Sequence, residues 1–258
     1  MVKTPKDIKE KVELAFKVAM LKKLHKPRIP VETVEKEHVK PGVPEADKLL
    51  EDTTRLVEKV VKDCLPLVES MVEAYKVDFP SKIVLMPYLQ EELGIFVVFY
   101  GYYDEETKTI YLNTTQFFGY RYSAIKSFEA WSDLGKLDKK DINEAAKCAT
   151  EWLTIYYLLH ELYHHLFHQK YPELAKKMHE DEILHEDEEF NAGIFAMSYS
   201  VPVLYAYLNC KDTEFEKYMK FVTLINEDLS HSTSDELLSY AKYELENILS
   251  GNLMELKI

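Results

Sequence analysis

The stretch HELYHHLFH at positions 160–168 decides how the rest of the chain is interpreted. His160, His164 and His168 recur every four residues, and Glu161 follows the first of them. Residues four apart lie on one face of an α-helix, so the imidazoles of His160 and His164 can reach a single ion while Glu161 lies beside it. This is the HExxH pattern, in which two neutral ligands hold Zn²⁺ and a glutamate serves as general base.

The surroundings of this motif favour a buried site over a histidine-rich helix that meets solvent. No glycine or proline occurs from residue 141 to residue 169, which predicts one helix beginning near Asp141 or Ile142, and Pro172 ends it. Apolar side chains cover most faces of this helix: Trp152, Leu153, Ile155, Tyr156, Leu158, Leu159, Leu162, Leu166 and Phe167. Because buried imidazoles need partners, and one ion serves two of them, a metal site is the better interpretation.

A catalytic zinc site usually has three protein ligands, so the motif requires a third. The pattern HExxHxxGxxH does not fit, because its glycine and its last histidine correspond to Phe167 and Lys170. His168 shares the face of the first two histidines, but ligands on three successive turns lie in a row and surround a tetrahedral ion poorly. We therefore expect His168 to support the site or to lie at the surface rather than to bind the metal.

A glutamate from the following segment, HEDEEFNAGIFAMSYSVP at 185–202, is the remaining option. Ala192, Gly193 and Ala196 follow Glu189 on its predicted helix and form a face of small residues, which can approach the HExxH helix closely. Two neighbouring glutamates of the same acidic segment remain alternatives, Glu186 and Glu188.

These two segments together resemble a known family. HELYHHLFH, followed about twenty-five residues later by Glu-x-x-Ala-x-x-Phe-Ala and then Pro, is similar to the ImmA/IrrE family of gluzincin-type metallopeptidases. When Phe195, Ala196 and Pro202 are aligned with the family pattern, Glu189 falls at its third zinc ligand. The family usually has Asn or Asp at the position of Gly193, so a hydrogen bond to the site is expected to be missing or to come from another residue.

The resemblance covers about residues 80–208 and implies a zinc peptidase fold. It implies that His160, His164 and Glu189 hold Zn²⁺ and that Glu161 is the general base for hydrolysis of a peptide or protein substrate. Mn, Fe and Co suit the same ligands. Resemblance to gluzincins also suggests that the strand at 109–113, with Ile110, Tyr111 and Leu112, pairs with an extended peptide through its free edge.

Two questions remain open for the site. An oxyanion in the reaction needs a hydrogen-bond donor, for which the sequence offers Tyr199, Tyr205, Tyr163 and His231 without an order among them. The competing hypothesis is a catalytically silent module that uses a zincin fold for binding or regulation. The intact Glu161 favours an enzyme, because a purely structural zinc site needs no base.

Outside the motif, helical segments surround one region of strands. Three runs rich in β-branched and aromatic residues predict antiparallel strands at 81–88, 93–103 and 109–113. Apolar spacing predicts further helices at 4–25, 44–75, 173–184, 187–209, 213–227 and 234–249. Pro66 should kink or break the second of these.

The predicted fold is α+β and mainly α, with a zincin-like core. Its small three-stranded antiparallel sheet packs on the HExxH helix, and helices are added at both ends. We expect an N-terminal helical region (1–78) with a proline-rich linker (26–44), a metallopeptidase core (79–210) and a C-terminal helical extension (211–258).

Composition limits the possible partners. A formal net charge of −13 opposes general binding to nucleic acid, which depends on Lys and Arg neutralising phosphates. The three cysteines are odd in number and far apart, so an intracellular, cytoplasmic setting is the simplest interpretation. The uncharged stretch at 190–208 contains Asn191 and Pro202, and we expect a buried helix there rather than a membrane span. The sequence predicts no oligomeric state.

Overall fold

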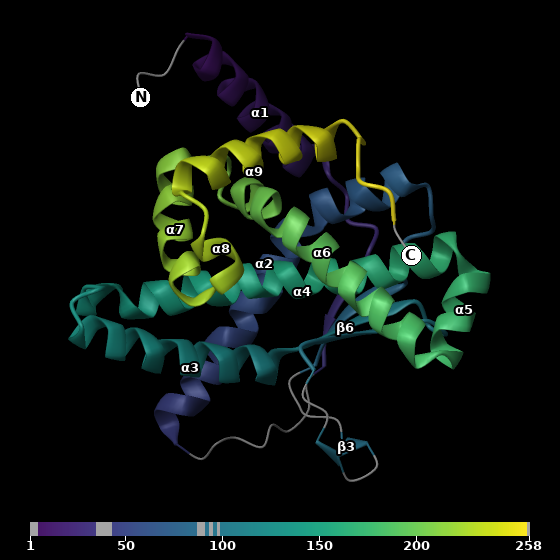
Figure 1. Cartoon of the computed structure of the whole chain (residues 1–258), viewed down its shortest axis with the longest axis horizontal. Helices are drawn as coiled ribbons and strands as arrows, with labels where there is room; N and C mark the ends of the chain where they lie inside the picture. Colours follow the sequence, from purple (N-terminus) through teal and green to yellow (C-terminus); the bar gives the residue numbers. More distant parts are fainter. Residues whose placement is uncertain (1–4, 35–42, 87–90, 93–94, 97–98, 257–258) are drawn as a thin grey trace.

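The computed structural model describes residues 5–34, 43–86, 91–92, 95–96 and 99–256, and it is mainly helical (Figure 1). Its helices are α1 (Pro5–Leu24), α2 (Pro44–Tyr75), α3 (Thr114–Asp133), α4 (Ile142–Lys170), α5 (Pro172–Glu180), α6 (Glu182–Tyr207), α7 (Asp212–Ile225), α8 (Glu227–Ser230) and α9 (Ser234–Leu249). The expected class, mainly α with a small sheet, is confirmed. α2 continues through Pro66, so of the expected kink or break, the break does not occur.

The main sheet is mixed rather than antiparallel, with the strand order β1-β2-β6-β5. β1 (Val31–Thr33) pairs in parallel with β2 (Lys82–Met86), and β2 pairs in parallel with β6 (Thr109–Asn113). β5 (Gly101–Asp104) lies at the edge and runs antiparallel to β6. The prediction of three antiparallel strands is therefore wrong. β6 lies between β5 and β2, and it runs antiparallel to β5 but parallel to β2.

The remaining parts of the predicted strands either lie outside the described residues or form a second, two-stranded sheet. Residues 87–88, 93–94 and 97–98 of the predicted strands lie outside the described residues. β3 (Glu91–Glu92) and β4 (Ile95–Phe96) form a separate antiparallel pair. β1 was expected only as part of an extended linker.

α3 was not predicted as a separate helix, and it begins directly after β6. The side chain of Asn113, the last residue of β6, accepts hydrogen bonds from the backbone N–H groups of Thr115 and Gln116. An asparagine that caps a helix in this way satisfies donors that have no partner within the helix.

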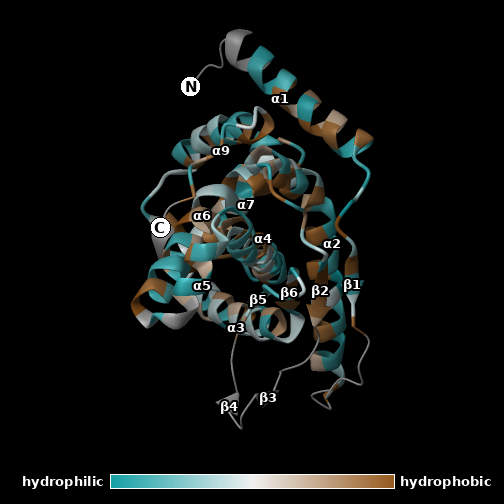
Figure 2. Ribbon diagram, turned by 90° about the vertical axis from the view of Figure 1, so that its right-hand side faces the viewer, coloured by the Kyte–Doolittle hydropathy of each residue, from teal (hydrophilic) through white to brown (hydrophobic). Residues whose placement is uncertain are grey.

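α4 is the central helix, as the apolar residues around the HExxH motif predict. Figure 2 shows it nearly end-on, with α2, α3, α6 and α7 around it. Ala145, Ala146 and Ala149 on α4 are fully buried. Strands β5 and β6 also pack against α4. The motif therefore lies in the interior between the sheet and α6.

The N-terminal helices share the core of the rest of the chain. The largest cluster of buried apolar residues extends from Leu14 on α1 to Leu256 near the C-terminus. The buried carboxylate of Glu69 on α2 accepts hydrogen bonds from the backbone N–H groups of Arg28 and Ile29, at 2.8 and 3.0 Å, and so fixes the chain just before β1. The predicted boundaries after residues 78 and 210 therefore do not separate hydrophobic cores.

α6 contains most of the uncharged stretch at 190–208 and packs against α4 and α9. Pro202 lies inside this helix. Within the described part of the chain, no helix combines the length and apolar character that crossing a membrane requires. α9 begins with a capping box between Thr233 and Glu236.

Candidate metal centre

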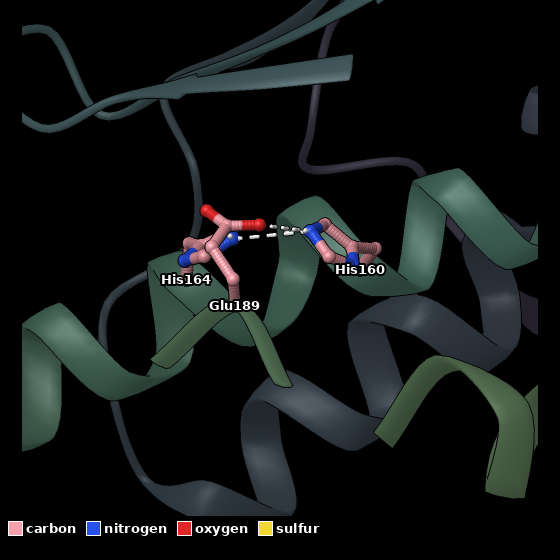
Figure 3. Close-up of side chains that lie close together, drawn as sticks. All are labelled: His160, His164 and Glu189. Atoms are coloured by element: carbon pink, nitrogen blue, oxygen red, sulfur yellow. Dashed lines mark hydrogen bonds and ion pairs between the residues drawn. The ribbon is translucent and has the colours of Figure 1, made fainter. Parts of the chain in front are cut away.

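His160 and His164 lie one turn apart on α4, and Glu189 on the neighbouring helix α6 lies beside both of them (Figure 3). The Nε2 atoms of the two histidines are 3.3 Å apart. The carboxylate oxygens of Glu189 lie 3.1 Å from the His160 Nε2 and 3.4 Å from the His164 Nε2. The structure therefore brings together the three residues predicted as metal ligands.

These separations are close to the spacing of ligands around a single tetrahedral ion, with one Glu189 oxygen (Oε2) facing His160 and the other (Oε1) facing His164. Donor atoms that bind Zn²⁺ at about 2.0–2.1 Å in tetrahedral geometry lie about 3.3–3.4 Å from one another. Two imidazole nitrogens and one carboxylate oxygen are also a common donor set for catalytic zinc. The Glu189 side chain is 47% exposed, which leaves the cluster accessible from solvent. The residues present therefore fit a zinc ion.

A second set of possible ligands, His164, His168 and Glu188, adjoins the first and is buried. The Glu188 Oε1 lies 2.6 Å from the His164 Nδ1 and 2.9 Å from the His168 Nε2. Both distances are typical of hydrogen bonds and shorter than the donor spacing around a tetrahedral ion. Glu188 therefore contacts the far side of the His164 ring, whereas Glu186, the other alternative ligand, is exposed.

The electrostatics of Glu188 agree with a hydrogen-bonded carboxylate. Burial opposes its ionisation, but the hydrogen bonds from His164 and His168 and the attraction of their charges outweigh burial and lower the pKa of Glu188 to about 2. In Glu189, burial is likewise outweighed by the hydrogen bond to His160 and the charges of His164 and His160, so its pKa is lowered. Both acids are ionised at neutral pH and available as acceptors or ligands.

Glu161 follows His160, and its buried carboxylate lies against strand β5. Burial raises the pKa of Glu161 well above its usual value, and the negative charge of Glu189 raises it further. A Cβ atom added to Gly101 on β5 would lie 2.5 Å from the Glu161 Oε1 and 2.8 Å from its Cδ. Gly101 therefore leaves the space that the Glu161 carboxylate fills.

His165, the remaining histidine of the motif, has a structural role. It is fully buried, and its Nε2 donates a hydrogen bond to the backbone carbonyl of Asp78 at 2.7 Å. Its Nδ1 lies 3.2 Å from the hydroxyl of Tyr103. Both ring nitrogens are therefore satisfied in the neutral form. Burial lowers the pKa of His165 to about 4.

We expect His165 to make the metal-free protein less stable as the pH falls from about 6.5 toward 4. In this window the unfolded chain takes up a proton that the folded protein excludes, so the unfolded state binds more protons. The stabilisation is complete above pH 6.5, and at most about 3 kcal/mol of it is lost by pH 4. Urea unfolding in EDTA, for wild type and His165→Gln, measures the difference. Equal pH dependence in the two proteins would contradict this prediction.

Tyr199 and Tyr205, proposed as oxyanion donors, do not reach the cluster. They follow Glu189 by ten and sixteen residues on the continuous helix α6, or about 15 and 24 Å along its axis. The Tyr199 hydroxyl accepts a hydrogen bond from the backbone N–H of Met254 at 2.7 Å. The Tyr205 hydroxyl lies 2.8 Å from the Asp212 carboxylate, to which it donates. These two tyrosines hold the C-terminal segment and the α6–α7 connection.

The other two candidate donors, His231 and Tyr163, differ in their position relative to the cluster. His231 is exposed and directly follows α8, which packs against α7. Tyr163 is buried, and its ring stacks on that of Phe167 with centroids 5.8 Å apart. The Tyr163 ring also has its centroid 6.1 Å from that of His164, so of these two candidates Tyr163 is the one that lies next to the cluster.

Two tyrosines that were not predicted as site residues lie next to the cluster. The rings of Tyr156 and Tyr157 have their centroids 6.3 and 6.1 Å from that of His160. Tyr100 stacks on Tyr157 with centroids 4.5 Å apart. Helical spacing carried the signal, because Tyr156 and Tyr157 precede His160 by four and three residues and so share its side of α4.

Comparison of the chain with protein-family models, curated proteins and solved structures gave no match. At Gly193, where ImmA/IrrE proteins usually have Asn or Asp, a Cβ would lie 3.4 Å from the Tyr156 hydroxyl. The His160 Nδ1 is buried and has no hydrogen-bond partner among the described residues.

Proposed function

We propose that this protein is a zinc-dependent metallopeptidase of the gluzincin type. His160, His164 and Glu189 would hold the ion, and Glu161 would be the general base. The observation that carries the proposal is a cluster of three donors, His160, His164 and Glu189, whose facing atoms lie 3.1–3.4 Å apart, together with the buried Glu161 that directly follows His160 on α4. The resemblance of the sequence to the ImmA/IrrE family supports the same reaction.

Glu161 and Glu188, the two buried carboxylates beside the cluster, suit different tasks. Zinc supplies a Lewis acid that makes water a nucleophile at neutral pH and polarises a substrate carbonyl. Glu161 takes the proton of the attacking water on its carboxylate and passes it to the leaving amine. Burial, which raises the pKa of Glu161, favours its protonated form and so the second of these transfers. Glu188, whose pKa is low, stays an acceptor for His164.

Tyr157 is the better candidate for the oxyanion donor. Its ring contacts His160, and it lies one turn before Glu161 on α4. Burial and the neighbouring acidic groups raise the pKa of Tyr157 to about 12, so its hydroxyl keeps its proton at neutral pH. A protonated hydroxyl near the reacting carbonyl stabilises the negative charge that develops there.

The strand that would bind an extended peptide is β5 rather than β6. Ile110, Tyr111 and Leu112 lie in β6, which pairs with β2 on one side and β5 on the other, so its main-chain groups are already used. β5 is at the end of the strand order in the described sheet, and Gly101 of β5 contacts Glu161. A peptide added to β5 would run close to the proposed base.

The proposed substrate is a peptide or protein, and the proposed setting is intracellular. The three cysteines, Cys64, Cys148 and Cys210, are free and buried, which supports a reducing compartment. The net charge of −13 remains unfavourable for nucleic acid.

Metal content tests the proposed ligands directly. Elemental mass spectrometry of purified wild type is expected to find about one zinc per chain, and His164→Ala and Glu189→Ala should each lose it, because each removes one of three donors. Glu186→Ala is the matched control, since this exposed glutamate lies on α6 beside the site. A wild type that contains no metal and takes up none from added zinc would refute the site.

A further inference from the structure

Glu188 occupies a shared position between two histidines of α4. Its Oε1 atom lies 2.6 Å from the His164 Nδ1 and 2.9 Å from the His168 Nε2. The side chains of Glu188, His164 and His168 are 2%, 9% and 4% exposed, so water competes little for these contacts. The same turn of α6 carries Glu189, the proposed ligand.

The chemistry of these groups fixes where the protons are. An ionised carboxylate only accepts hydrogen bonds, so the His164 Nδ1 and the His168 Nε2 must each carry a proton. With its proton on Nδ1, a neutral His164 ring has its lone pair on Nε2, which faces His160 and Glu189. Glu188 thereby selects the tautomer and the ring orientation that metal binding needs.

Of the two histidine ligands, only His164 has a described hydrogen-bond partner on the ring nitrogen that faces away from the cluster. His168 lies one turn after His164 and fixes Glu188, and its own Nδ1 is 3.5 Å from the Glu105 carboxylate in the β5–β6 turn. His160, by contrast, has a buried Nδ1 without a hydrogen-bond partner among the described residues. Most of the orientation of the histidine ligands therefore depends on the contacts of His164.

We propose that Glu188 is a positioning residue for the ligand His164, that His168 holds Glu188 in place, and that this pair sets the metal affinity of the site. The inference rests on the proposed metal centre. The competing assignment is a second metal ion bound by His164, His168 and Glu188, which the described geometry permits. The distances of 2.6 and 2.9 Å favour protons over an ion, because two donor atoms bound to one tetrahedral zinc ion lie about 3.3 Å apart.

Competition with a fluorescent zinc chelator tests the proposal. Glu188→Gln keeps the size of the side chain but removes the charge, and His168→Gln removes the ring that holds Glu188. Each is expected to weaken zinc binding about 10- to 100-fold, while wild type and Glu186→Gln keep one high-affinity ion per chain. Thermal unfolding in EDTA serves to detect a folding defect in either variant.

Nuclear magnetic resonance of the histidine rings in the metal-free protein supplies a second readout. Wild-type His164 is expected to show a proton on Nδ1, and that tautomer preference should weaken in Glu188→Gln. Unchanged zinc affinity in both folded variants would overturn the proposal, as would two ions per wild-type chain with one lost in Glu188→Gln. Weaker zinc binding in a protein that hydrolyses no peptide would overturn only the peptidase function, whereas a wild type that binds no zinc would overturn both.

Discussion

Replacing Glu161 by glutamine is expected to lower peptide hydrolysis by about 10²- to 10⁴-fold and to leave about one zinc per chain. Glutamine has nearly the same shape and fills the space beside Gly101, so the fold and the three ligands are preserved. It cannot take a proton from water, which removes the proposed base. Hydrolysis of a peptide library, measured together with metal content, tests both parts.

Glu151→Gln is the matched control for this experiment. Glu151 is also a buried glutamate of α4 and lies about two and a half turns before the motif. Its carboxylate accepts a hydrogen bond from the Tyr207 hydroxyl at 2.9 Å. This variant should hydrolyse peptides at the wild-type rate. If Glu161→Gln also keeps the wild-type rate, Glu161 is not the base. If wild type binds zinc and cleaves nothing, the catalytically silent binding or regulatory module becomes the better interpretation.

The elements that could be predicted from sequence are those that depend on local periodicity. α4 was predicted from a gap-free helical pattern, and the meeting of His160 with His164 follows from a spacing of four. Glu189 depended on a pattern of small residues together with a family resemblance. The same helical spacing explains why Tyr199 and Tyr205, which the sequence offered as oxyanion donors, are far from the ligands: they lie about three and about four and a half turns beyond Glu189 on α6.

Pairings between distant segments could not be predicted in the same way. The parallel contact of β2 with β6, and of β1 with β2, depends on how the chain crosses between strands, and short apolar runs do not encode direction. The position of Glu188 against two histidines likewise depends on the rotation of α6 relative to α4. A register shift of one residue would exchange Glu188 and Glu189, so both acids had to remain candidates.

Gly101 is the clearest case of such a long-range requirement. It is separated from Glu161 by sixty positions, and as a glycine in a predicted strand it had no assigned role. We expect Gly101→Ala to reduce hydrolysis about 10²-fold while zinc stays bound, because an added Cβ would overlap the Glu161 carboxylate, and displacing a reacting group by about 1 Å has an effect of this size. The rate of hydrolysis and the zinc content of the variant are the measurements. Gly119→Ala, where an added Cβ meets nothing within 4 Å, is the control and should change neither.

The same contact can be measured without any substrate. Gly101→Ala is expected to lower the free energy of unfolding by about 1–3 kcal/mol, the usual effect of overfilling a packed site. In a Glu161→Ala background the side-chain atoms that the Cβ would overlap are absent, so the same substitution should have almost no effect. Urea unfolding of the four proteins of this double-mutant cycle gives the coupling directly. Additive effects would mean that the Glu161 carboxylate does not occupy the space beside Gly101, and the loss of hydrolysis in Gly101→Ala would then need another cause.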